Sequence, residues 1–469
     1  MNVNFYLNFI TNSYYKLVRL QEDAYFRISG LIVVVTLLNV LALLLINAGI
    51  TTIFGGYIYA FSILGLRWPK QLLYIYAFFV SYNHREFTYL TMQIDSVPIY
   101  ITEWVILILS ITGMSHLRET VKKYWYPLSI LLVYLLLGLW IFIETFPRWG
   151  FVQAMRDFVI VYYAIFALIV MLNIRNEKDY RYLVYAFILG TIPNMIADTL
   201  NFLYLTFPSN YDQQNNSMMS SYFYIIGAGF CFPYLFTDNN KINKWPSIYI
   251  GWVLLDIFMY SYSKTAMIAF LLMLLTYLIL RFKKLERRHY MMIAAVMIIP
   301  IIFTPSLKIN SIAKLVNPNT FLSNNRMLLV SGSMRDFSEY PYGIGFGSPI
   351  FGKHSNEMIR NLEKIHAPHN SYITVIRRMG VIGGMLFFAV LTITLMTGYR
   401  NYRNFIDESN DKKMALGNML ALIGPISFCM GHVVLEGPFL GIPFWIIVGS
   451  TYFISCQMSN GDSRQVSSV

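Results

Sequence analysis

The sequence predicts an all-α polytopic transmembrane protein of about 12 to 14 spans with one large outward-facing loop. Three observations lead to this fold class. Of the 469 residues, 56% are hydrophobic and only 13% are charged, whereas roughly a quarter of the residues in ordinary soluble domains are charged. Apolar runs recur along the chain, many of them near the roughly 20 residues that cross a bilayer. A single long polar interval interrupts them, between Thr304 and Tyr372.

The apolar runs give the predicted spans in order. They lie at residues 31–46, 50–66, 70–82, 98–115, 126–144, 157–173, 181–205, 219–236, 245–260, 263–281, 289–304, 372–399, 414–433 and 438–456. Several are short for an unaided crossing, so some spans are tilted, re-entrant or fused. The count falls to about 12 if the short pair 50–66 and 70–82 does not cross fully.

Short basic clusters between these runs predict the orientation. Every second connection carries one of them: Arg67 and Lys70; Arg118, Lys122 and Lys123; Arg175, Lys178 and Arg181; Lys241 and Lys244; Arg281, Lys283, Lys284, Arg287 and Arg288; and Arg400, Arg403, Lys412 and Lys413. The positive-inside rule makes these connections cytoplasmic. Segments 83–97, 145–156 and 206–218, the turn at 261–265 and the long loop then lie outside.

The same reasoning divides the chain into five regions. We expect a cytoplasmic N-terminal segment at 1–27, transmembrane helices at 28–304, a large extracytoplasmic loop with the catalytic motif at 305–371, C-terminal transmembrane helices at 372–456 and a cytoplasmic tail at 457–469. The net charge of +12 follows this topology, so no nucleic-acid partner is predicted. Cys231, Cys429 and Cys456 lie in or beside apolar segments, which indicates neither a disulfide framework nor a cysteine metal site.

Cationic side chains on the predicted outer face are the first candidates for chemistry. Lys264 lies where two apolar runs join, so it either snorkels to the interface or offers a cation to an anionic group. Arg326 lies early in the long loop and is a solvated charge or a second such cation. Arg148 and Arg156 also fall on this face, where an arginine beside a tryptophan is common at the lipid interface.

The end of the long loop holds the remaining candidates. His366 and His369 are three residues apart, with His354 upstream, a spacing that could seat zinc on a helix. No cluster of carboxylates or cysteines completes such a site, so we predict no metal and no cofactor. A histidine followed by Asn370 suits the positioning or deprotonation of a hydroxyl group, because its usual pKa leaves it largely neutral at pH 7.

Three glycines alternate in Tyr340-Pro341-Tyr342-Gly343-Ile344-Gly345-Phe346-Gly347. A phosphate-binding loop of this kind would follow a strand and precede Lys-Ser or Lys-Thr, and neither is present. A tight turn led by the backbone is therefore predicted.

Four motifs, in order along residues 260–385, resemble the O-antigen ligase and O-antigen polymerase superfamily. They are Ser263-Lys264-Thr265, Asn325-Arg326, the glycine segment at 340–347, and Pro368-His369-Asn370-Ser371-Tyr372 leading to Gly380-Val381-Ile382-Gly383-Gly384. The topology is also similar, since these proteins have many spans and a large outward loop in the C-terminal third. The preceding spans resemble the family in hydropathy alone.

The resemblance implies a GT-C-like helical glycosyltransferase of the bacterial inner membrane that works without a metal or a nucleotide sugar. Its donor would be an undecaprenyl-diphosphate-linked oligosaccharide and its acceptor a glycan or a lipid-linked glycan, with a chain-length regulator or flippase as a possible partner. His369 and Arg326 would be catalytic, and Lys264 and Arg326 would bind the diphosphate. Asn370, Tyr372, Arg148, Arg156 and His366 would support them.

Lys264 departs from the arginine usual at its position in the family. Lysine keeps the charge but lacks the two-pronged hydrogen bonding of a guanidinium group. The motifs do not separate a polymerase from a ligase, nor O-antigen from capsule or exopolysaccharide assembly.

A transporter or flippase for a lipid-linked oligosaccharide or polyanion is the alternative from another class. It predicts an internal repeat and ionisable residues near mid-membrane. We find no convincing repeat. Asp198 and Asp256 lie within apolar segments and either form an ion path or are satisfied by neighbouring helices. The other polar candidates gather at the outer face, which favours the enzyme.

Overall fold

The computed structural model describes the chain in nine ranges. They are residues 50–82, 91–94, 97–203, 211–236, 243–257, 263–281, 325–348, 370–406 and 409–466, with the two residues between 94 and 97 and the other intervening segments left out. The chain forms two compact units, residues 1–63 and 64–469. The first contributes only the start of helix α3 to the described part, and every feature below belongs to the second.

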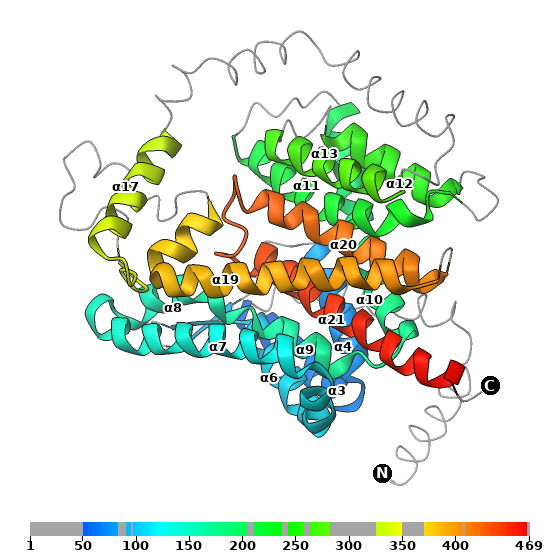
Figure 1. The fold of residues 1–469 in the computed structure, drawn as a ribbon. Coiled ribbons are helices and arrows are strands. Elements are labelled where there is room, and N and C mark those ends of the chain that lie inside the picture. The colour runs from blue at the N-terminus through cyan, green and yellow to red at the C-terminus, as the bar shows by residue number, and fades with distance from the viewer. Residues whose placement is uncertain are drawn as a thin grey trace, which may run out of the picture. The chain divides into compact units, whose positions relative to one another are not determined.

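The described chain is almost entirely helical, so the predicted all-α polytopic fold class is confirmed (Figure 1). Its helices are α3 (Ile50–Arg67), α4 (Pro69–Tyr82), α6 (Ile101–Gly113), η3 (Met114–His116), α7 (Leu117–Trp149), α8 (Phe151–Tyr162), α9 (Ile165–Asn173), α10 (Glu177–Leu203), α11 (Tyr211–Cys231), η4 (Phe232–Tyr234), α12 (Lys244–Leu255), α13 (Lys264–Arg281), α17 (Asn325–Glu339), α19 (Ser371–Asn404), α20 (Asn410–Phe428) and α21 (Pro438–Val466).

A small β-hairpin departs from the predicted pattern. Strands β1 (Thr91–Ile94) and β2 (Val97–Tyr100) pair antiparallel, with Thr91 opposite Tyr100. Glu103 accepts a hydrogen bond of 2.9 Å from the Tyr100 backbone N–H, which caps the start of α6. The hairpin lies mostly within the segment 83–97 that the charge pattern leaves outside the membrane.

Within the described residues, four helical stretches are long and apolar enough to cross a membrane, or five if the bent pair α8 and α9 counts as one span. Predicted runs 31–46 and 289–304 lie outside the described residues, and α4 and α12, with 14 and 12 residues, are short for a full crossing. The total of about 12 to 14 spans therefore stays a prediction.

One of the four stretches, Ile101–Trp149, holds two of the predicted spans. The end of α6 lies against the end of α9, where Asn173 donates to the Leu109 carbonyl over 3.2 Å. Further along α7, a Cβ placed on Gly138 would lie 2.6 Å from Val161 near the end of α8. Helix α6 therefore lies parallel to α9, whereas α7 lies antiparallel to α8. The chain direction changes at η3, between α6 and α7.

Helix α19 is the element around which the site is built. It packs against α7, α17, α20 and α21, and Figure 1 shows it (gold) running between α7 and α20. Elsewhere small residues allow close helix contacts, as expected inside a bilayer. A Cβ on Gly229 would lie 2.5 Å from the backbone nitrogen of Ala421, and one on Gly449 would lie 2.5 Å from the carbonyl oxygen of Ala167.

Two contacts join connections that the charge pattern places on the same side of the membrane. Lys70 and Asp179, from two connections predicted to be cytoplasmic, form an ion pair of 2.6 Å. Segments predicted to lie outside meet each other instead, as Phe346 does when its N–H donates to the Thr145 hydroxyl over 3.2 Å. This grouping supports the alternation of sides.

Cysteine labelling will test which side is which. Arg148 and Arg400 are both exposed, and the native Cys231 and Cys429 are buried. In a Cys456→Ser background, we expect a membrane-impermeant maleimide to label Arg148→Cys in intact cells and Arg400→Cys only after lysis. The reverse pattern would contradict the predicted orientation.

Candidate functional site

The site begins at a break in α19. Gly380 has φ 69° and ψ −166°, so the helical hydrogen-bond pattern stops there. In an unbroken helix, the Val381 N–H would donate to the carbonyl of Arg377. Instead it donates to the Pro341 carbonyl over 2.9 Å, and the Arg377 carbonyl accepts from the Ile344 N–H over 2.9 Å. The segment 341–345 therefore lies directly against the opened turn.

Two glycines make this close approach possible. A Cβ on Gly343 would lie 2.6 Å from the Arg378 carbonyl oxygen, and one on Gly380 would lie 2.2 Å from the carbonyl carbon of Tyr342. Gly343, Gly345 and Gly347 all have positive φ, at 95°, 82° and 89°. The predicted tight, backbone-led turn is thus confirmed, and its partner is the glycine motif of α19.

We expect Gly380→Ala to disrupt this docking. A non-glycine residue in that backbone region costs about 1 to 3 kcal/mol, and its Cβ would also collide with the Tyr342 backbone. Thermal unfolding in detergent should show a lower melting temperature than wild type. Gly251→Ala is the matched control, because its added Cβ meets no atom within 4 Å and alanine favours a helix. Equal melting of Gly380→Ala and wild type would contradict the prediction.

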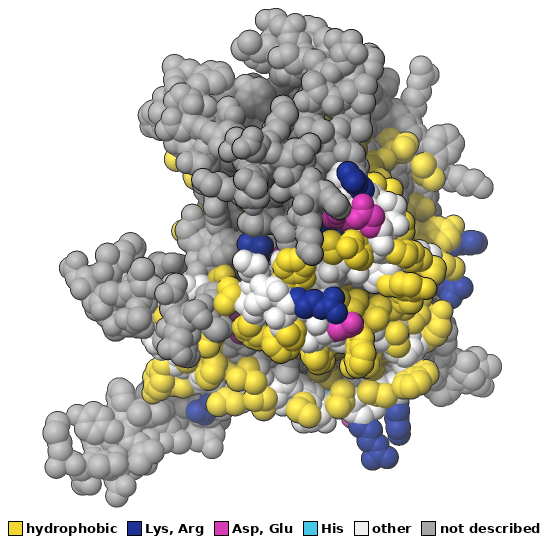
Figure 2. All heavy atoms as spheres, turned by 90° about the vertical axis from the view of Figure 1, so that its left-hand side faces the viewer, with side chains coloured by type: hydrophobic (Ala, Val, Ile, Leu, Met, Phe, Trp, Pro, Cys, Tyr) yellow, Lys and Arg dark blue, Asp and Glu magenta, His cyan; other side chains and the backbone are white. Residues whose placement is uncertain are grey.

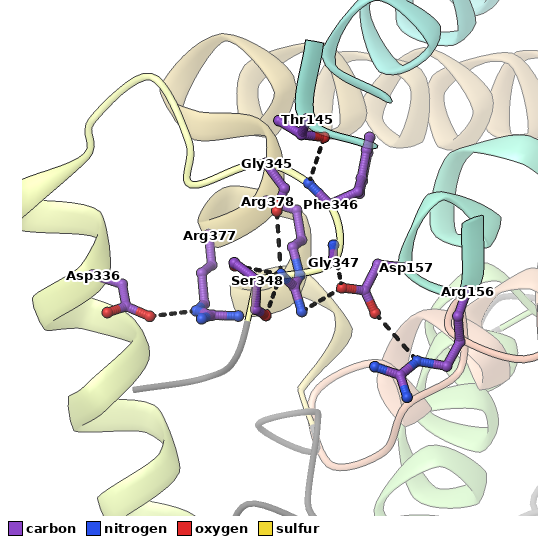
Figure 3. Close-up of polar contacts among 10 residues, drawn as sticks. All are labelled: Thr145, Arg156, Asp157, Asp336, Gly345, Phe346, Gly347, Ser348, Arg377 and Arg378. Carbon is purple, nitrogen blue, oxygen red and sulfur yellow. Dashed lines mark hydrogen bonds and ion pairs between the residues drawn. The ribbon is translucent and has the colours of Figure 1, made fainter. Parts of the chain in front are cut away.

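The side chain of Arg378 fixes the far end of the glycine segment (Figure 3). It is only 1% exposed. Its Nη1 donates to the Gly345 carbonyl (3.1 Å) and to the Ser348 carbonyl (2.8 Å) and hydroxyl (2.6 Å). Its Nη2 forms an ion pair of 2.6 Å with Asp157 Oδ2, which also accepts from the Gly347 N–H over 2.8 Å. Helix α19, the loop and α8 are thereby joined.

Arg377 makes the equivalent link to α17. Its Nε lies 2.6 Å from Asp336 Oδ2, and its side chain is 1% exposed. Burial raises the pKa of Asp336 above its usual value, and the neighbouring Arg377 offsets part of that rise. The two adjacent arginines of α19 therefore hold α17 and α8 at opposite ends of the glycine segment (Figure 3).

Removing one partner of a buried ion pair is costly, because the other charge remains without compensation. Asp157→Ala should therefore lower the free energy of unfolding by about 3 to 5 kcal/mol. The control is Glu119→Ala, whose side chain is 77% exposed and lies 3.8 Å from Arg175. Exposed pairs of that kind contribute about 0 to 1 kcal/mol. Denaturant titration in mixed micelles measures both, and equal effects would show that the Asp157 pair is not a structural link.

The start of α19 is held to the connection between α20 and α21, residues 429–437. Asn370 caps α19 by accepting from the Ile373 N–H over 3.1 Å, and its Nδ2 donates to the Met430 carbonyl over 3.1 Å. Ser371 donates its N–H to the Cys429 carbonyl over 2.9 Å. The Tyr372 hydroxyl donates to the Ile426 carbonyl over 2.6 Å. Asn370, Ser371 and Tyr372 thus attach the start of α19 to the end of α20 and to the connection that follows it.

The turn that carries Lys264 reaches the same connection. The buried Ser263 hydroxyl accepts from the Ala266 N–H over 3.2 Å, so it supports the first turn of α13. A Cβ placed on Gly431 would lie 2.8 Å from the Thr265 hydroxyl oxygen. The neighbours of Lys264 and of His369 therefore both contact residues 429–437.

The structure does not describe every predicted site residue. His354, His366 and His369 lie outside the described residues, as do the side chains of Lys264 and Arg326. The backbone places Lys264 at the first position of α13 and Arg326 at the second position of α17. Ten residues of helix separate Arg326 from Asp336, a rise of about 15 Å. The chain near residue 264 and the chain near residue 370 therefore both contact residues 429–437. Arg326 lies on α17, a different helix, near its start.

Arg148 and Arg156 are both exposed. Arg156 lies 3.7 Å from Asp157, and its side chain is 49% exposed. Arg156 therefore lies beside the buried ion pair of Arg378 and Asp157. Arg148 lies in the last turn of α7, close to Gly150.

Five charged residues of this region were not identified from the sequence: Arg377, Arg378, Asp157, Asp336 and Glu436. A signal existed for the two arginines, because adjacent charges inside an apolar run are rare unless they are paired. Nothing in the sequence indicated their partners, which lie far away along the chain. Among the described residues, no group of three or more His, Cys, Asp or Glu could hold a metal ion.

The two acidic residues that would favour transport each accept a hydrogen bond from α11, whereas Asp256 Oδ1 is buried and accepts none within the described residues. Tyr224 donates to Asp198 over 2.7 Å, and Ser221 donates to Asp256 over 3.1 Å. These contacts match a buried-acid explanation and give no specific support to an ion path.

Comparison with known proteins identifies one family. Residues 249–388 match the family model described as O-antigen ligase. The match spans the Lys264 turn, α13, α17, the glycine segment and the broken part of α19, which are the elements that meet here. No curated protein matches the chain.

Proposed function

We propose that this multi-pass membrane protein, in which residues 249–388 match the O-antigen ligase family model, is a member of the O-antigen ligase and polymerase superfamily and a glycosyltransferase of surface-polysaccharide assembly. It transfers an oligosaccharide from undecaprenyl diphosphate to a sugar hydroxyl of a glycan or lipid-linked acceptor. The reaction belongs to the outer side of the bacterial inner membrane, and the enzyme is of the polymerase or the ligase type.

One observation carries this proposal. The segments that hold the motif residues are distant in sequence, yet Thr265 and Asn370 both contact the short connection 429–437. Those contacts bring the chain next to Lys264 and the chain next to His369 to one place. A convergence of this kind is expected of a site in which a cation and a proton acceptor act on the same substrate.

The residue types suit the chemistry of glycosyl transfer. When the glycosyl diphosphate bond breaks, negative charge grows on the departing diphosphate, and cations in a partly dry site stabilise that charge. Arg326 and Lys264 take this role in the proposal. The acceptor hydroxyl must face the anomeric carbon and lose its proton, so His369 orients or deprotonates it. Asn370 and Tyr372 hold the chain at its attachment point.

A deletion strain complemented with point variants tests the proposal. We expect wild type to restore long surface polysaccharide on a gel ladder, while His369→Ala and Arg326→Ala, expressed at wild-type levels, do not. Lys264→Ala should lose most of the activity and Lys264→Arg should keep it, because arginine supplies the same charge with more directional hydrogen bonds.

Arg335→Ala is the matched control on α17. Its side chain is 67% exposed and pairs with Glu339 on the same helix, so its loss should leave the ladder unchanged. Single repeat units on the final acceptor in the deletion strain would indicate a polymerase. Full-length chains left on the lipid carrier would indicate a ligase. Full activity of both His369→Ala and Arg326→Ala would refute the catalytic assignment.

A further inference from the structure

Glu436 lies near the end of the connection 429–437, to which the neighbours of Lys264 and of His369 are attached. The N–H of its neighbour Leu435 donates to the Ser371 hydroxyl over 3.3 Å, which fixes this part of the connection to the first turn of α19. The Thr374 side chain, one turn further along α19, lowers the pKa of Glu436, so it lies nearby. Residue 436 of the connection thus lies beside the first turns of α19, which begins at Ser371.

The charges around Glu436 leave it without a direct ion-pair partner among the described residues. Two buried guanidinium groups face three carboxylates here. Arg377 is paired with Asp336 and Arg378 with Asp157, both at 2.6 Å. Neither arginine lies within ion-pair distance of Glu436 in the described part of the chain, although both act on it electrostatically.

The Glu436 side chain also has unused hydrogen-bonding capacity. Its Oε1 atom is buried and makes no hydrogen bond within the described structure. A buried carboxylate oxygen without a donor is costly unless the group takes up a proton. Glu436 is therefore the member of this cluster that is best placed to gain and lose a proton.

The electrostatic surroundings agree with that role. Burial raises the pKa of Glu436 to about 7, while the Thr374 side chain lowers it, Asp157 raises it, and Arg378 and Arg377 lower it. Cys429, at the end of α20, is a further titratable neighbour of Glu436, and His432 lies on the same connection. A general base works best when its pKa lies near the operating pH.

We propose that Glu436 is a second proton-transfer residue of this site, the carboxylate that takes up the proton of the acceptor hydroxyl. The inference rests on the proposed glycosyl transfer. The acceptor oxygen bonds to the anomeric carbon, and the bond from that carbon to the diphosphate oxygen breaks. Its electron pair leaves with the undecaprenyl diphosphate. The hydroxyl proton passes to Glu436 and then to water, while His369 orients the hydroxyl.

The test uses the full-length protein in detergent, with a lipid-linked oligosaccharide as donor, across a range of pH. Ionised Glu436 is the active form, so the wild-type rate should rise with pH through about 7. Glu436→Gln should lower kcat by about 10²- to 10⁴-fold with little change in KM, and it should lose that rise. Glu436→Asp, which keeps a carboxylate on a shorter side chain, should restore part of both.

Two controls separate this inference from the proposed function. Glu339→Gln, on an exposed turn of α17, should keep the wild-type rate and pH profile. His369→Ala reports on the transfer reaction itself. If Glu436→Gln keeps the wild-type kcat and pH profile while His369→Ala abolishes transfer, the role of Glu436 is refuted and the glycosyltransferase proposal stands. If wild type transfers nothing, both proposals fail.

An infrared titration gives a readout that does not depend on activity. The wild type minus Glu436→Gln difference spectrum should contain a protonated-carboxyl band that disappears as the pH rises through about 7. Glutamine matches the protonated glutamic acid in shape, so the variant is expected to fold. The absence of such a band across the titration would overturn the inference.

Discussion

The backbone exchange at Gly380 is the interaction on which the rest of the site depends. A helix opened inside a membrane protein leaves polar backbone groups that must find new partners. Here the loop supplies them, because Ile344 and Gly345 donate to the freed carbonyls of Arg377 and Arg378, and Pro341 accepts from Val381. The opened turn of α19 thus provides backbone groups to which the loop is hydrogen-bonded, and these bonds fix segment 341–345 against the helix.

The side chains of Arg377 and Arg378 also stabilise the contact between the loop and α19. Each guanidinium group is 1% exposed and is paired with a carboxylate on another helix, α17 or α8. Burying a charge is unfavourable unless pairing and further hydrogen bonds compensate, so the pairs are effective only when the helices and the loop are assembled together. Figure 2 shows the end of the molecule at which α17 and α8 lie, where charged side chains are set among hydrophobic ones on the surface. The polar interactions of the site lie within the protein, where they can hold reacting groups in position.

Local sequence patterns predicted much of this structure, and non-local pairing accounts for the rest. The hydropathy runs predicted most described helices closely, because each helix satisfies its own backbone and its apolar length is set by the membrane. The alternating glycines predicted a tight turn because φ above zero is a local property. The partners of Arg377 and Arg378 were not predictable, since Asp336 and Asp157 are brought close only by the packing of α17 and α8 on α19. Glu436 was missed for the same reason, and the β-hairpin was missed because its strands are only four residues long.

The central claim is that the assembled outer segments catalyse transfer of a lipid-linked oligosaccharide. Purified full-length protein in liposomes, supplied with an undecaprenyl-diphosphate-linked oligosaccharide and an acceptor glycan but no nucleotide sugar, tests it most directly. Mass spectrometry of the products should show the acceptor lengthened by the donor's oligosaccharide, together with released undecaprenyl diphosphate. If the donor instead moves between the leaflets with its glycosyl diphosphate bond intact and the acceptor is unchanged, the protein is a transporter and the claim is wrong.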